Sequence, residues 1–72
     1  MRIDEQIKIV CIKNEITMAE IARRLGITPQ AFSQKMRRGT FSLDNLENIA
    51  LVAGCKLECH FVMNNGDKVT IV

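Results

Sequence analysis

The chain has 72 residues, of which 47% are hydrophobic and 25% charged, and its formal net charge is +2. A chain this short holds at most one domain, because it cannot divide its core. The longest uncharged apolar run, residues 9–12, is far too short to span a bilayer, and no signal-peptide pattern opens the sequence. The three cysteines are an odd number, so we expect reduced thiols in a cytosolic compartment.

The charges are segregated along the sequence. Residues 21–43, called here the basic window, contain no Asp or Glu. Its five basic side chains are Arg23, Arg24, Lys35, Arg37 and Arg38. A solvated helix face usually mixes both signs, and a chance solvated face is the alternative interpretation. The segregation favours a polyanionic partner.

Apolar residues at helical spacing predict a first helix over residues 4–14. The face expected in the core holds Ile3, Ile7, Val10 and Cys11. Ile9 and Ile12 lie roughly opposite this face. A helix that is apolar on two sides needs two covers, and the second is either the C-terminal segment or a second chain.

Start and stop signals place a second helix over residues 17–25. Thr17 and Glu20 have the spacing of a capping box, in which each side chain satisfies a backbone donor of the other residue. Ile16 and Ile21 have the spacing of a hydrophobic staple, and Gly26 can adopt the left-handed conformation that ends the helix.

Two more helices follow. The third has Thr28 as its N-cap, Pro29 at its first position, and runs to about Arg38. The fourth begins at Ser42 and closes at Gly54. Its inward residues are expected to be Leu46, Ile49, Ala50 and Ala53.

After the fourth helix the pattern alternates, which predicts two strands, 57–63 and 68–72, joined by a turn over 64–67. A two-residue loop would mix apolar and polar side chains on each face. A three-residue loop with Gly66 in the left-handed bulge position gives one apolar face, so we favour it. Its register pairs Phe61 with Val69, Cys59 with Ile71, Val62 with Lys68 and His60 with Thr70.

Two short helices joined by a tight turn that contains glycine form the outline of a helix-turn-helix. Ala22 is small where the two helices must cross, and Gly26 takes the turn. The residues expected to face inward are Ile21, Leu25, Ile27 and Phe32. This spacing fixes the angle at which the third helix is presented.

Over about residues 5–54 the chain resembles the XRE, or Cro/repressor-like, helix-turn-helix proteins of bacteria and phages. The matching residues are Ile7, Val10, Thr17, Ile21, Ala22, Leu25, Gly26, Ile27, Phe32, Ser42 and residues 46–50. One departure is Lys35, which stands where the family usually has an apolar residue, while the apolar residue follows at Met36. The chain also resembles a subgroup of short regulators that end in a hairpin.

The resemblance implies a mainly α fold: a four-helix, lambda-repressor-like helix-turn-helix domain followed by a C-terminal β-hairpin. We expect one domain over residues 1–72, with a helical DNA-binding core at 1–54 and a dimerising hairpin at 55–72. The implied function is that of a sequence-specific, repressor-like transcriptional regulator that binds double-stranded DNA. Its expected location is the cytoplasm, at the nucleoid, of a bacterium or a phage-infected host.

The resemblance also implies that the third helix enters the major groove, and the helical geometry agrees. With Phe32 and Met36 inward, the outer face carries glutamines, which can pair with adenine, and arginines, which can pair with guanine. The expected base-reading residues are Gln30 and Gln34, with Thr28 and Ser33 as further contacts. The expected phosphate contacts are Lys35, Arg37, Arg38, Thr17 and Thr40. Plain solvated glutamines are the alternative.

A single recognition helix reads few base pairs, so we expect a homodimer that binds two half-sites. Hairpin edges and the spare apolar surface of the first helix are the expected interface. Its residues are Ile9, Ile12, Phe61, Val62, Val69 and Ile71. The alternative function is a protein-interaction module, such as an antitoxin-like or anti-repressor partner that uses the hairpin edge, although such a module has no need of the basic window.

Little in the sequence supports catalysis, because there is one His, no Tyr or Trp, and no Gly-rich phosphate loop after a strand. Cys55, Cys59 and His60 lack the paired Cys-x-x-Cys spacing of a metal site, and adjacent strand residues point to opposite faces. We therefore expect no enzyme activity, no metal, no cofactor, no small-molecule ligand and no membrane partner.

Overall fold

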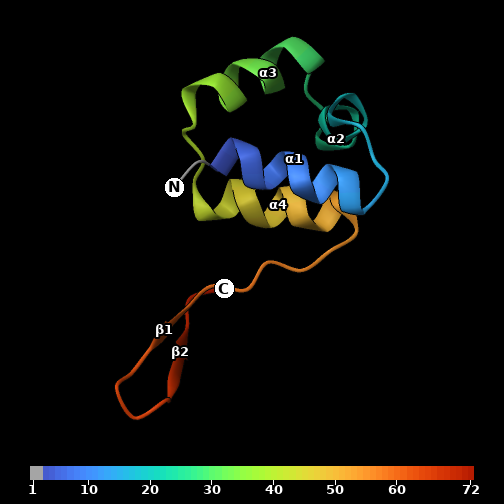
Figure 1. The fold of residues 1–72 in the computed structure, drawn as a ribbon. Coiled ribbons are helices and arrows are strands. Elements are labelled where there is room, and N and C mark those ends of the chain that lie inside the picture. Colours follow the sequence, from blue (N-terminus) through green and yellow to red (C-terminus); the bar gives the residue numbers. More distant parts are fainter. Residues whose placement is uncertain (1–2) are drawn as a thin grey trace.

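The computed structural model describes residues 3–72, which form a bundle of helices followed by a small antiparallel hairpin (Figure 1). The helices are α1 (Ile3–Lys13), α2 (Met18–Leu25), α3 (Pro29–Arg38) and α4 (Leu43–Ala53). The strands are β1 (His60–Val62) and β2 (Lys68–Thr70). The fold class expected from the sequence is confirmed, and each helix begins and ends within one residue of its expected bounds.

Side-chain caps begin three of the helices. The hydroxyl oxygens of Thr17, Thr28 and Ser42 accept hydrogen bonds from backbone N–H groups three residues further on. Between α2 and α3, Gly26 has φ +79°, a left-handed conformation that glycine adopts without steric cost. The chain therefore reverses direction within a few residues, and α3 leaves the turn at a fixed angle to α2.

The capping box expected at Thr17 and Glu20 is only half formed. The backbone N–H of Glu20 donates to Thr17 Oγ1 at 3.0 Å. The Glu20 carboxylate instead accepts hydrogen bonds from Arg23 and Arg24, whose guanidinium groups carry a positive charge that a backbone N–H lacks. A complete box occurs at the start of α4, between Ser42 and Asn45.

The core lies where α1, α2, α3 and α4 converge, and Ile21 at its centre is completely buried. The buried side chains around it are those of Ile7, Cys11, Ala22, Phe32, Met36, Ile49 and Ala53. Ile3, Val10, Leu25, Ile27 and Leu46 pack against them, half-buried. The inward faces expected for α1, the helix-turn-helix and α4 are thereby confirmed.

Two side chains join the other helices to the C-terminal end of α4. Asn14 Nδ2 donates to the Ala53 carbonyl at 2.9 Å, and Arg24 donates to the Val52 carbonyl at 2.7 Å. These carbonyls have no partner inside the helix, and a positive charge is favourable at this end of a helix dipole. The two bonds join the residue that follows α1, and the last turn of α2, to the end of α4; these three helices form the frame against which α3 packs.

The hairpin has the expected three-residue loop. The pairs are His60 with Thr70, Phe61 with Val69, and Val62 with Lys68. The N–H of Gly66 donates to the Met63 carbonyl at 2.9 Å, and Gly66 has a positive φ of 93°. The register argued from one apolar face is confirmed.

The strands are shorter than expected, and the hairpin stands apart from the helices (Figure 1). Strand geometry covers residues 60–62 and 68–70, and not 57–63 and 68–72. Residues 55–57 instead line an apolar groove between α1 and α4, where Leu57 is half-buried. Ile9 and Ile12, on the outer face of α1, remain exposed (45% and 76%). Within residues 3–72, the C-terminal segment therefore does not cover this second apolar face of α1.

Candidate nucleic-acid interface

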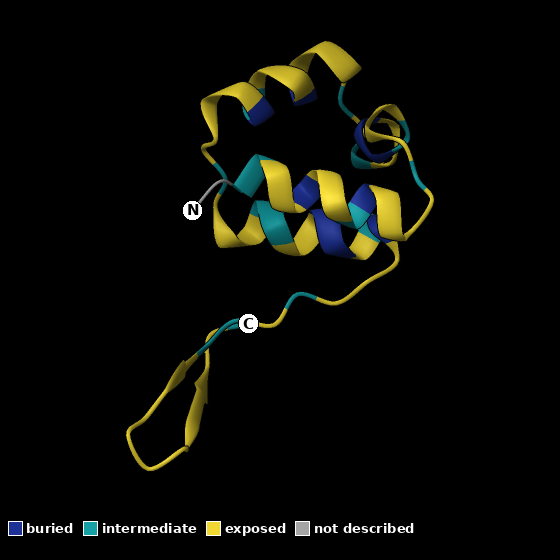
Figure 2. Ribbon diagram, in the orientation of Figure 1, coloured by how far each residue is buried: buried dark blue, intermediate teal, exposed yellow. Residues whose placement is uncertain are grey.

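The outer face of α3 is polar and exposed along its whole length. Phe32 and Met36 turn into the core, with exposed fractions of 2% and 7%, and fix the rotation of the helix. The exposed side chains on the remaining surface are those of Gln30, Ser33, Gln34, Arg37 and Arg38. In Figure 2 most of the α3 ribbon has the colour of exposed residues, and its buried stretches lie toward the other helices. No hydrogen bond or ion pair within residues 3–72 engages these side chains.

The start of α3 presents its polar groups at the turn of the helix-turn-helix. Thr28 Oγ1 accepts a hydrogen bond from the Ala31 N–H at 3.1 Å, so its oxygen serves as the N-cap. A hydroxyl group has one donor and two acceptor sites, so capping leaves the Thr28 O–H able to donate outward. Gln30 follows in the first turn, and Gln34 lies one turn further along the same face.

The end of α3 carries the cations of the outer face. Arg37 and Arg38 are exposed in the last turn, and Gly39 in a left-handed conformation ends the helix after them. Thr40 Oγ1 donates to the Arg38 carbonyl at 3.4 Å, so Thr40 lies against this helix end. The two arginines thus lie about one turn beyond Gln34 and about two turns beyond Gln30 along the helix.

Arg23 and Arg24 have a different environment from the arginines of α3. Both contact the carboxylate of Glu20, and Arg24 also reaches the end of α4. The hydrogen bond from Arg23, with a smaller contribution from Arg24, lowers the pKa of the Glu20 carboxyl group below its ordinary value. The same contact raises the pKa of Arg23. Two of the five cations in the basic window therefore share one carboxylate just outside it, which offsets one of their two positive charges.

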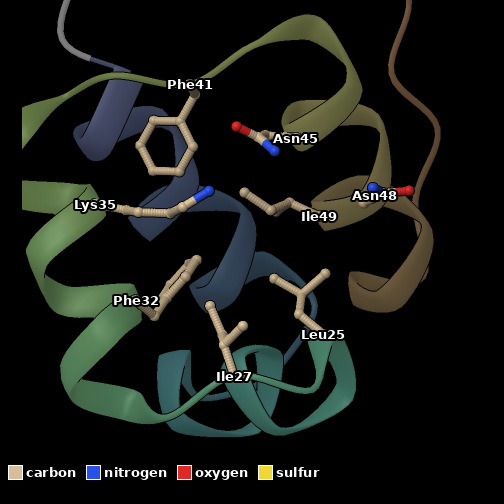
Figure 3. A pocket seen from close by; sticks show the side chains of 8 residues that line it. All are labelled: Leu25, Ile27, Phe32, Lys35, Phe41, Asn45, Asn48 and Ile49. Atoms are coloured by element: carbon tan, nitrogen blue, oxygen red, sulfur yellow. The ribbon is translucent and has the colours of Figure 1, made fainter.

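Lys35 lies on the flank of α3 and points into a cavity of about 160 Å³ between α3 and α4 (Figure 3). The walls of this α3–α4 cavity are Leu25, Ile27, Phe32, Phe41, Asn45, Asn48 and Ile49. The Lys35 side chain is half-buried, in contrast to the exposed Arg37 and Arg38. Its ammonium group is thus directed toward α4 and away from the outer face of α3.

The remaining expected phosphate contacts lie at helix starts. Thr17 is exposed at the start of α2, where its hydroxyl oxygen caps the Glu20 N–H. At the start of α4, the N–H groups of Ser42 and Asn45 are engaged in the capping box. Only the other backbone amides of that first turn are left to face an anion.

The expected dimer residues are exposed, but they lie in two separate places. Ile9 and Ile12 are on α1, whereas Phe61, Val62, Val69 and Ile71 are on the hairpin, which stands apart from the helices (Figure 1). Further large apolar side chains are exposed at Met63 on the hairpin and at Leu51 on α4. Neither Met63 nor Leu51 is among the interface residues expected from the sequence.

Three features of the structure were not predicted from the sequence. The pairing of Glu20 with Arg23 and Arg24 could have been found, since residues three and four apart on a helix are neighbours. The flank position of Lys35 could also have been found, because a residue three after Phe32 lies about 60° from it around the helix. The bonds of Asn14 and Arg24 to α4 have no local sequence signal, since they join residues 39 and 28 positions apart.

Within residues 3–72, no group of three or more His, Cys, Asp or Glu side chains has an arrangement that could hold a metal ion. The cysteines are free: Cys11 is buried, Cys55 is exposed and Cys59 is half-buried. Burial raises the pKa of the Cys11 thiol. None of the helices in this part of the chain has the length and apolar character needed to cross a membrane.

Two short helices with a glycine turn, a buried inner face and an unengaged polar outer face on the second helix define a helix-turn-helix DNA-binding domain. The family model of the Cro/C1-type helix-turn-helix DNA-binding domain matches residues 6–58. The chain belongs to this family, whose members bind DNA and regulate transcription. Neither a curated protein nor a solved structure matches the chain.

Proposed function

We propose that this protein is a sequence-specific regulator of transcription that inserts α3 into the major groove of double-stranded DNA. The observation that carries the proposal is the outer face of α3, whose polar side chains have no partner within residues 3–72. An α-helix fits the major groove, where each base pair presents a distinct pattern of donors and acceptors. A polar helix face without internal partners is suited to that pattern.

Gln30 and Gln34 are the proposed base-reading residues. Both are exposed on the face opposite Phe32, and Gln30 lies in the first turn of α3, the end that approaches base edges in this kind of domain. A glutamine amide pairs bidentately with N6 and N7 of adenine. Thr28 and Ser33 border the glutamines and supply hydroxyl groups for further contacts.

Arg37 and Arg38 are the proposed phosphate contacts, joined by Thr17 and Thr40. The two arginines are exposed and have no acidic partner within residues 3–72, so their charge is available to the DNA backbone. Lys35 belongs to this set only if its side chain leaves the α3–α4 cavity when DNA binds. The chain is proposed to act as a homodimer and to repress by occupying its site, at the nucleoid.

Fluorescence anisotropy of a labelled duplex tests the proposal. On mixed-sequence DNA we expect a Kd of about 10⁻⁴ to 10⁻⁶ M, and log K should fall with log salt at a slope of about −0.9 for each phosphate contact. Two arginines in each protomer of a dimer give a slope of about −3.6. If no binding appears at low salt, α3 is not a DNA surface, and a protein-interaction module that uses the hairpin becomes the leading function.

Base reading is tested on an operator selected from random sequence. Gln34→Ala should weaken operator binding by about 5- to 150-fold, the range of 1 to 3 kcal/mol for one base contact, and leave non-specific binding unchanged. Gln6→Ala on α1 is the matched control, since Gln6 is also an exposed helical glutamine. Equal effects of the two substitutions on operator binding would contradict the assignment of α3 as the reading helix.

A further inference from the structure

The hairpin leaves two strand edges without partners, and its hydrogen bonds show which residues lie on them. The N–H of Met63 donates to the Asp67 carbonyl at 2.7 Å, and that of Ile71 to the Cys59 carbonyl at 2.8 Å. Backbone groups alternate between inward and outward along an antiparallel ladder. The outward groups therefore belong to His60 and Val62 on β1, and to Lys68 and Thr70 on β2.

One face of the hairpin is apolar and exposed. Phe61 and Val69 are paired on this face, with exposed fractions of 61% and 53%. Met63 and Ile71 lie on the same face, one at each end of this pair, with exposed fractions of 42% and 43%. Open edges and a contiguous apolar face are both features that proteins normally cover, which points to a partner on the hairpin.

A second copy of the chain fits the β1 edge. In a two-fold antiparallel pairing centred on Phe61, the outward groups of His60 meet those of Val62 of the second copy, and the converse pair forms as well. All residues of β1 are then paired. On the apolar face, Phe61 lies opposite Phe61 of the second copy, and Cys59 lies opposite its Met63, so only apolar side chains meet on this face. On the other face His60 lies opposite Val62 of the second copy.

The β2 edge fits a second copy less well. The equivalent pairing, centred on Val69, sets Asp67 opposite Ile71 of the second copy on the apolar face, so a carboxylate would meet an aliphatic side chain. The outward groups on this edge also belong in part to Lys68, and a lysine is a common means of preventing an edge strand from pairing. Other registers of the β1–β1 pairing are less favourable than the one centred on Phe61. A shift in either direction brings Glu58 or the loop residue Asn64 into the ladder.

From this self-complementarity we infer that two copies of the chain join β1 to β1 in register, with Phe61 facing Phe61, to form one continuous four-stranded sheet. The inference rests on the homodimer of the proposed function and names its interface. The hairpin lies at the opposite end of the molecule from α3, so this pairing leaves the outer face of α3 uncovered (Figure 1).

Engineered disulfides test the register. Phe61→Cys, in a background with Cys55→Ser and Cys59→Ser, should give a disulfide-linked dimer on mild oxidation. Residues opposite each other at such a non-hydrogen-bonded position have Cα atoms about 4.5 Å apart, within the disulfide range of about 4.4–6.8 Å. Val69→Cys in the same background is the matched control. In the inferred sheet the two copies of residue 69 lie about 14 Å apart, so its linked fraction should be at least about tenfold lower.

A second variant keeps Phe61, in case its loss weakens the dimer. Met63→Cys with Cys55→Ser retains Cys59, and the register predicts a disulfide between Cys59 and position 63 of the second copy. The two positions in one copy are about 13 Å apart along the strand, so an internal disulfide does not form. Mass spectrometry of the linked peptides identifies the pairs.

Linkage at position 69 in place of 61, or a monomer in sedimentation with no linkage at any position, would overturn the inference. Anisotropy on the reduced wild-type protein separates this result from the proposed function. Salt-dependent DNA binding without these disulfides means that the inferred sheet is wrong and that the proposed DNA binding stands. Disulfide formation at position 61 without DNA binding means that the proposed function is wrong and that the inferred sheet stands.

Discussion

Replacing Lys35 by leucine should stabilise the protein. The side chain is half-buried and points into the α3–α4 cavity of about 160 Å³, whose walls include Leu25, Ile27 and Phe32 (Figure 3). A leucine at this position would place apolar atoms against those walls and remove a charged group from them. Lysine and leucine have similar helix propensities, so the change acts through packing rather than through α3 itself.

The expected gain is about 1 kcal/mol. Full burial of a leucine side chain contributes about 1.5–3 kcal/mol, and a half-buried position gives about half of that. Cavity-filling substitutions commonly add about 0.5–2 kcal/mol. For a domain of this size, 1 kcal/mol raises the Tm by about 4–8 °C. Thermal unfolding followed by circular dichroism measures the shift directly.

Arg37→Leu is the matched control, because it makes the same chemical change at an exposed position of the same helix. It should change the stability by less than about 0.5 kcal/mol, but it should reduce the salt slope of DNA binding by about 0.9 for each lost contact. Lys35→Leu should leave that slope unchanged. A fall in Tm, or a slope lowered as much as in Arg37→Leu, would refute the assignment of Lys35 to the cavity.

Three further substitutions test the frame that holds α3. Ile21→Ala removes a completely buried side chain and should cost about 2–5 kcal/mol, a loss visible in a urea unfolding curve. Gly26→Ala should cost about 1–2 kcal/mol through backbone strain alone, since φ is +79° and nothing lies within 4 Å of an added Cβ; an unchanged midpoint would contradict this. Glu20→Gln should lower the Tm near neutral pH, and the gap to wild type should close as the pH falls through the lowered pKa of Glu20. The sign follows because a depressed carboxyl pKa contributes stability only while the group is ionised. A gap that persists at pH 2 would mean that the ion pairs with Arg23 and Arg24 are not its source.

Local signals were sufficient to place the helices. Thr28, Pro29 and Gly39 act within three or four residues of their own positions, so the start and end of α3 follow from neighbouring sequence. The rotation of α3 also follows, because Phe32 and Met36 are the apolar residues of one face. The hairpin register was predictable for a similar reason: a shift by one residue would move Phe61 and its neighbours to the polar face.

Competition between partners limits what the sequence can predict. Glu20 has the spacing for a capping box and the spacing for ion pairs with Arg23 and Arg24, and the sequence pattern alone does not rank the two. The predicted strand lengths were wrong for a related reason. The alternation over 57–63 is real, but Leu57 packs in the groove between α1 and α4, a contact that depends on the tertiary fold.

Competition between partners also means that the charge pattern overestimates how many cations are available to DNA. All five cations of the basic window together would give a dimer a salt slope of about −9 if each met a phosphate. Arg23 and Arg24 are engaged by Glu20, and Lys35 points into the cavity, so two cations per protomer remain on the outer face of α3. Glu20→Gln removes the carboxylate that engages Arg23 and Arg24, while the bond from Arg24 to the Val52 carbonyl remains. If those arginines are then able to reach the backbone, the slope of this variant should become steeper than the wild-type value of about −3.6, whereas an equal slope would place them out of reach of DNA.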